Sequence, residues 1–127
     1  MRIETIELKP AKELHQELRE RILDLPDVTE KQNAGIHDDA FFVGRTMFMH
    51  IHPESFRGCD MHIRLSKTDQ KRVLAEGRAR PHRWAPQAGY VTSIVKNKED
   101  LERTMELIRM SHQHFAGTRR NSANGKA

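Results

Sequence analysis

Apolar residues that recur every three or four positions predict three helices. The first covers residues 10–24, where leucine and isoleucine repeat at helical spacing between charged residues. A short second helix over residues 66–76 has Ser66 as its capping residue, and a last helix begins at the cap Asn97 and ends at Gly117. The apolar stripe of this last helix consists of Leu101, Met105, Ile108, His112 and Phe115.

Apolar residues that alternate with polar ones predict strands between these helices. Two such runs stand on either side of Gly44, a pattern typical of a hairpin turn. In the second run, Met47 and Met49 belong to one face, and Phe48 belongs to the other face with His50. The expected strands cover residues 28–36, 40–43, 46–52, 60–65 and 90–95, and a loop over residues 53–58 joins the third strand to the fourth.

The order of these elements predicts the α+β class. Sequential strands joined by short turns pair antiparallel, so we expect a curled antiparallel sheet of four to five strands with two or three helices packed on one side. A chain of 127 residues is long enough for one hydrophobic core. We therefore expect a single domain over residues 1–117, followed by a disordered tail over residues 118–127, which has no large apolar side chain.

The composition narrows the compartment and the partners. No apolar run approaches the roughly 20 residues that cross a bilayer, and the first residues lack the pattern of a signal peptide. The single cysteine, Cys59, fits a reducing compartment. We expect a cytoplasmic protein without a membrane partner, and since no flavin or adenylate motif is present, we expect no cofactor.

Positive charge is concentrated in one stretch of the chain. Formal net charge is +4, and residues 67–83 hold six basic residues against two acidic ones. Such a stretch can attract the phosphates of a nucleic acid, although a solvated charged helix and loop has the same composition. Nucleic-acid binding is therefore an alternative that is not favoured, and binding that weakens steeply with salt would identify it.

Histidines on neighbouring strands are the sharpest chemical feature. His50 and His52 are two residues apart on one expected strand, so both belong to one face, and His62 lies on the next strand. If the two strands pair in register, the three imidazoles converge. Because neutral imidazole binds zinc, copper and iron, a metal-dependent enzyme that uses His50, His52 and His62 is one hypothesis. Polar residues on the wet face of a half-buried sheet are the simpler alternative.

The favoured hypothesis is a non-catalytic binding module for a small anionic or aromatic ligand. A loop rich in arginine and proline follows the second helix and holds the only tryptophan, Trp84. An arginine would hold a negative charge by a bidentate contact and Trp84 would stack on a ring, unless it only packs against the core. The candidate ligand-binding residues are His50, His52, His62, Arg64, Arg80, His82, Arg83 and Trp84.

Other chemically interesting residues have structural explanations. A lone buried cysteine usually packs, so we expect Cys59 to be a core residue and not a nucleophile. The adjacent acids Asp38 and Asp39 are expected to make a polar turn before a strand. His112 belongs to the apolar stripe of the last helix and is expected to pack there.

Several sequence runs stand together in a recognisable order. They are residues 40–44 (AFFVG), His50 to His52, residues 60–65, residues 81–86 (PHRWAP), residues 89–92 (GYVT), residues 100–101 and residues 107–111. In this order they resemble the luciferase-domain family, a group of small, largely uncharacterised proteins, over about residues 14–115. The C-terminal half is also similar, more loosely, to MmcQ/YjbR-like proteins, small α+β domains for which DNA binding has been proposed.

The resemblance implies a fold but no catalytic residue. Its family name is not taken as an activity, because fold-level likeness does not determine function. The positions that it shares with the family include His50, His52, Asp60, Arg64, His82, Trp84 and Thr92.

Overall fold

The structure is a single open sheet with helices on one side. It is a computed structural model that describes residues 11–33, 38–55, 58–82 and 86–124, with the backbone alone for residues 11–12, 32–33, 38, 52–55 and 118–124. The helices are α1 (Ala11–Leu23), α2 (Lys67–Ala75), α3 (Lys98–Asn124) and the short 3-10 helix η1 (Pro86–Ala88). The strands are β1 (Val28–Asn33), β2 (Asp38–Val43), β3 (Thr46–Ser55), β4 (Gly58–Arg64), β5 (Arg80–Pro81) and β6 (Tyr90–Val95).

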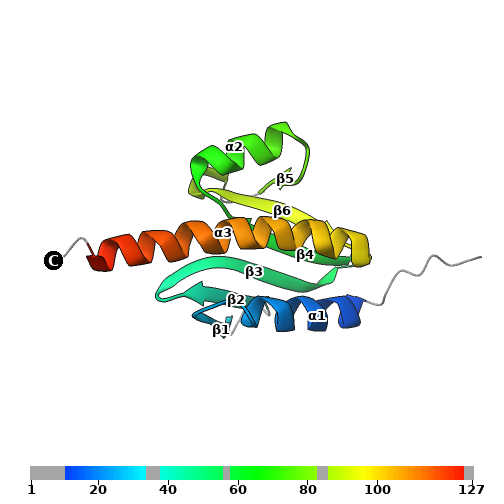
Figure 1. Ribbon diagram of the computed structural model, residues 1–127. Coiled ribbons are helices and arrows are strands. Elements are labelled where there is room, and N and C mark those ends of the chain that lie inside the picture. The colour runs from blue at the N-terminus through cyan, green and yellow to red at the C-terminus, as the bar shows by residue number, and fades with distance from the viewer. Residues whose placement is uncertain (1–10, 34–37, 56–57, 83–85, 125–127) are drawn as a thin grey trace, which may run out of the picture.

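The sheet confirms the α+β class and adds a strand. Its order is β1-β2-β3-β4-β6-β5, and all neighbouring strands are antiparallel. The sixth strand is β5, a two-residue strand in the segment that we expected to be a loop. The loop predicted over residues 53–58 was also wrong, because β3 extends to Ser55 and β4 begins at Gly58. In Figure 1, α1 and α3 cross one face of the sheet, and α2 lies near β5 and β6.

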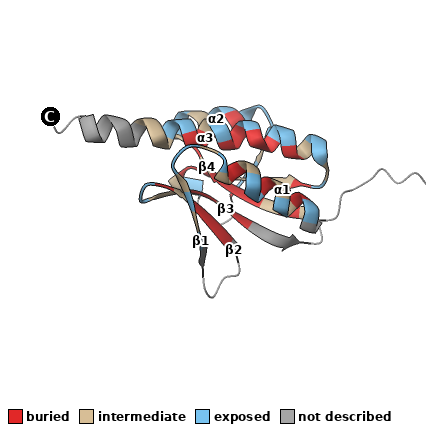
Figure 2. Cartoon of the chain, turned by 60° about the horizontal axis from the view of Figure 1, so that its bottom comes forward, coloured by how far each residue is buried: buried red, intermediate tan, exposed pale blue. Residues whose placement is uncertain are grey.

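The core lies between the sheet and helices α1 and α3. The apolar residues of α1 that repeat at helical spacing are all fully buried, as are most of those of α3. Figure 2 shows the buried residues gathered between these helices and the strands. Leu65, which precedes α2, and Val73, which lies in α2, belong to the same cluster. A single core therefore supports the domain.

The observed helix caps agree with those expected from the sequence. The hydroxyl of Ser66 accepts a hydrogen bond from the Asp69 amide at 3.0 Å, at the start of α2. The Asn97 side chain accepts from the Asp100 amide at 2.8 Å, and the Asp100 carboxylate accepts from the Lys96 amide at 3.0 Å. Helix α3 does not end at Gly117 as expected but continues to Asn124. The division into a domain of residues 1–117 and a tail stays a prediction.

One β-bulge corrects the predicted faces of β3. Phe41 pairs with Met49 and Phe42 pairs with Met47, so Phe48 is an extra residue in β3. Phe48 and Met49 are both fully buried, whereas the sequence pattern placed Phe48 on the face of His50. The Phe48 ring contacts His112 of α3 edge-on, with ring centroids 5.9 Å apart. The bulge thus gives the core one more aromatic ring and leaves His50 on the opposite face.

Within the described ranges, no helix combines the length and the apolar character that a membrane span requires.

The approach of Gly89 to β4 generates a stability prediction. Gly89 has φ +97°, and a Cβ atom there would lie 2.3 Å from the backbone oxygen of Leu65. We expect Gly89→Ala to lower the free energy of unfolding by about 3 kcal/mol or more, because it combines left-handed strain with a backbone clash. Gly77→Ala is the matched control, since Gly77 has φ +70° with no atom within 4 Å of the new Cβ, and should cost about 1 kcal/mol. Urea denaturation measures both, and equal losses would contradict the close approach.

Candidate metal centre

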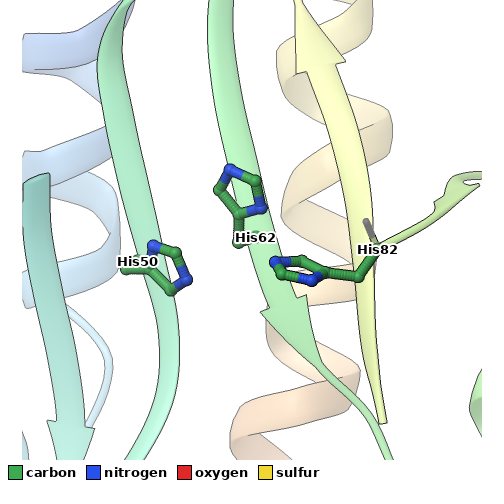
Figure 3. A group of neighbouring side chains, drawn as sticks. All are labelled: His50, His62 and His82. Atoms are coloured by element: carbon green, nitrogen blue, oxygen red, sulfur yellow. The ribbon is translucent and has the colours of Figure 1, made fainter. Parts of the chain in front are cut away.

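Three imidazoles meet on the face of the sheet that α1 and α3 leave uncovered. His50 comes from β3, His62 from β4, and His82 follows β5 directly. The rings of His50 and His62 are stacked, with centroids 4.6 Å apart and an interplanar angle of 10°. The ring of His82 stands at 74° to that of His62, with centroids 4.8 Å apart. One nitrogen from each residue lies within 4.8 Å of the other two, and Figure 3 shows the rings converging in front of the strands.

Strand register brings these residues together. His50 is the direct cross-strand partner of His62, which confirms the pairing on which the sequence-based hypothesis depended. His62 in turn pairs with Thr92 of β6, and Arg80 of β5 pairs with Thr92 from the other side. Because side chains alternate along an extended chain, His82 lies on the same face as Arg80, two residues earlier. The two-residue strand β5 is therefore what carries His82 to the other histidines.

The histidine face is more buried than a wet sheet face. His62 and His82 are each 7% exposed, and only His50 is intermediate. The flanking residues of His62, Met61 and Ile63, are fully buried on the opposite, helix-covered side. Burial of polar rings costs free energy unless they find polar partners, so the cluster differs from the solvated alternative.

Tyr90 and Thr92 complete the wall of the cluster. The Tyr90 ring lies 5.3 Å from the His82 ring and 5.8 Å from the His50 ring, between centroids. Burial raises the pKa of Tyr90 while the charge of Arg64 opposes that shift, so its phenol stays protonated at neutral pH. The Thr92 hydroxyl lies 3.5 Å from Nδ1 of His62, a long contact whose donor depends on the tautomer of the imidazole.

The environment of His82 favours its neutral form. Burial lowers the pKa of His82, and the nearby His50 lowers it further. Neutral imidazole, with a lone pair on one nitrogen, is the form that binds a metal ion. Burial therefore keeps His82 in the form that can ligate a metal ion.

The remaining candidate ligand-binding residues are not part of the histidine cluster that the structure describes. Nε of Arg64 donates to the Ala88 oxygen at 3.0 Å, and its guanidinium carbon lies 5.1 Å from the centre of the Phe115 ring. Arg64 therefore joins η1 and α3 at the end of the sheet. Arg80 is exposed on β5. The backbone of His52 pairs with Asp60, but its side chain lies outside the described residues, as do Arg83 and Trp84 entirely.

The metal set predicted from the sequence and the observed cluster share two of three members. His50 and His62 were expected to converge, and His82 was assigned to the ligand-binding loop and not to the metal set. The missing signal is β5, since Arg80-Pro81 is too short to show alternation and proline is uncommon within strands.

Most of the residues that were expected to have a structural role have one. Burial raises the pKa of Cys59 to about 11, with a smaller contribution from Asp60, so this core thiol is not an activated nucleophile. Nε2 of His112 lies 2.8 Å from the Pro26 oxygen, which confirms its packing role. The expected turn at the paired acids was wrong, because both lie in β2, where Asp39 contacts His15 of α1 at 2.9 Å.

The basic stretch of residues 67–83 is partly neutralised by its surroundings. Arg72 pairs with Asp69 at 3.0 Å, and Arg78 pairs with Glu106 at 3.3 Å. Lys67 donates to the backbone oxygen of Gln87. The two ion pairs reduce the field that a nucleic-acid backbone would meet, whereas the contact of Lys67 leaves its charge in place.

Together the fold and the cluster define a small α+β domain that bears three converging histidines on an open sheet face. The family model of the Luciferase domain matches residues 45–111, which is more than half of the chain. The chain therefore belongs to the Luciferase domain family, as the sequence resemblance implied, and the matched region includes all three histidines. Neither the curated proteins nor the solved structures include a significant match to this chain.

The lowered pKa of His82 generates a prediction on stability. The unfolded chain takes up this proton near the ordinary histidine pKa of 6.5, whereas the folded protein takes it up only at lower pH. The stability that neutral His82 contributes is therefore complete above that value and is lost as the pH falls below it. His82→Gln should lose less unfolding free energy than wild type between about pH 7.5 and about pH 5.5, measured by urea denaturation.

An exposed residue of α3 without a titratable side chain supplies the control for this comparison. Gln113→Ala should show the same acid-dependent loss as the wild type, because exposed Gln113 carries no group that takes up a proton. An unchanged acid-dependent loss in His82→Gln would show that the burial of His82 has no effect on its titration.

Proposed function

We propose that this chain is a transition-metal-binding domain in which His50, His62 and His82 hold one zinc ion. The observation that carries the proposal is the convergence of one nitrogen from each residue to within 4.8 Å of the others. Three protein ligands leave a fourth position for water or an added ligand, as in zinc sites that do chemistry.

Small side-chain movements are enough to form the site. A tetrahedral zinc ion with Zn–N bonds of about 2.0–2.1 Å places its nitrogens about 3.3 Å apart. The present spacing of up to 4.8 Å therefore has to contract by no more than about 1.5 Å. Rotations within the side chains supply such a change without moving the strands, whose separation is fixed by the β ladder at about 4.8 Å.

The donor set favours zinc among the available ions. Imidazole binds zinc, copper, iron and nickel, whereas calcium and magnesium require oxygen ligands. The thiol of Cys59 points into the core with the pKa raised by burial, so it does not add a soft ligand. Zinc accepts the irregular arrangement of three rings because it has no preference from its d electrons.

The surroundings of the three histidines suit a zinc ion that takes part in a reaction as well as one that is only bound. Zinc held by the three imidazoles would lower the pKa of a bound water to about 7 and would thereby supply a nucleophile at neutral pH. The Tyr90 phenol and the Thr92 hydroxyl are the neighbouring groups that would orient a ligand or a histidine there.

The other functional hypotheses have less support. Arg64 is engaged with Ala88 and Phe115, so it is not positioned as the anchor of an anionic ligand over the histidines. A small anionic ligand would instead bind at the open metal position. For nucleic-acid binding, the ion pairs of Arg72 and Arg78 offer no specific support.

Metal titration of protein without a histidine tag tests this proposal. Wild type should bind one zinc ion per chain, measured by elemental analysis and by competition with a chromophoric chelator. His50→Ala, His62→Ala and His82→Ala should each weaken zinc binding by at least about 100-fold, because each removes a direct ligand. His114→Ala should bind like wild type, since this exposed residue of α3 lies outside the cluster.

Two outcomes would contradict the proposal. One is wild type that binds no stoichiometric zinc, and the other is zinc binding that survives in all three cluster variants. Circular dichroism of each variant without metal separates a lost ligand from a lost fold.

A further inference from the structure

A groove separate from the histidines runs along the outer edge of β6. It has a volume of about 560 Å³ and lies between β6, the segment that joins α2 to β5, and the first half of α3. None of the three cluster histidines lines it, although Thr92 lies at the boundary of both sites. A volume in the range of about 300–1,000 Å³ suits a small ligand or a few residues of peptide.

The edge of β6 beside this groove is only partly covered. Strand β5 begins at Arg80, which pairs with Thr92, and continues with Pro81, which pairs with Val91. Residues 77–79, which precede β5, line the groove and do not pair with β6. Strand β6 continues to Val95, so within the described part of the chain no strand pairs with residues 93–95 on the side away from β4. An edge of this kind offers backbone N–H and C=O groups to another extended segment.

The charges along the groove indicate which kind of extended segment could pair with the edge of β6. Asp100 and Glu106 also line the groove, but each is ion-paired, to Arg103 at 2.6 Å and to Arg78 at 3.3 Å. Arg80 and Lys96 line the two ends of the open edge and are exposed. Neither forms an ion pair with any residue that the structure describes. The open edge is therefore flanked by positive charges.

We propose that this edge binds an acidic peptide segment, which adds to the sheet as an antiparallel or parallel strand beside residues 93–95. Backbone hydrogen bonds to β6 hold the segment, and its carboxylates lie against Arg80 and Lys96. A second copy of the chain does not fit, because pairing β6 with β6 would bring the same positive side chains together. A small anion would meet the charges but leave the backbone edge unused.

Binding to a designed peptide tests the proposal on the full chain. The probe is an acetylated, fluorescently labelled hexapeptide that alternates valine and glutamate, and the control peptide alternates valine and lysine. Fluorescence anisotropy should show binding of the acidic peptide alone. Hydrogen exchange followed by NMR should show slower exchange of those backbone amides of residues 93–95 that point away from β4 when this peptide is bound.

Charge-reversal variants distinguish this edge from general attraction. The double variant Arg80→Glu with Lys96→Glu should weaken binding of the acidic peptide by at least about tenfold. The matched control is Arg45→Glu with Lys71→Glu, which changes the same charge at two exposed residues that do not line the groove, and should retain binding. Thermal unfolding of both double variants verifies that they are folded.

Each of four results would overturn the proposal. They are no binding of the acidic peptide, equal weakening in both double variants, unchanged exchange of residues 93–95 in the complex, and N-acetylglutamate that binds as tightly as the peptide. The last result would identify the groove as a site for small anions.

Discussion

The antiparallel register of β3, β4 and β6 is the constraint on which the whole structure depends. On one side of β4, Met61 and Ile63 are fully buried against the helices, and the residue between them, His62, faces the other way. A slip of one residue would exchange these two faces and place an imidazole in the apolar core. The hydrophobic effect therefore fixes the face on which the histidines lie, because burial of their neighbours excludes a slip of one residue.

The sequence predicted the elements with strong periodicity and missed those that tertiary contacts create. Helical spacing in α1 and the caps Ser66 and Asn97 appear in the structure because they depend on residues a few positions apart. The bulge at Phe48 could not be predicted, since alternation alone gives no sign of an inserted residue. The sequence predicted that His50 and His62 would meet only if their strands paired in register. It did not predict that His82 would lie beside them.

Strand β5 determines both proposed sites through its length. It is long enough for Arg80 to pair with Thr92, which brings His82 onto the face of His50 and His62. It also begins only at Arg80, opposite Thr92, so within the described residues no strand covers residues 93–95 of β6 on the groove side. One two-residue strand thus completes the histidine cluster on the sheet face and uncovers a separate surface at the sheet edge.

The central claim is that the three imidazoles share one cation, and diffraction at the zinc absorption edge tests it most directly. Crystals grown with zinc should give a single anomalous peak about 2 Å from one ring nitrogen of His50, His62 and His82. Imidazoles that remain stacked with no peak between them, or a peak held by other residues, would contradict the account.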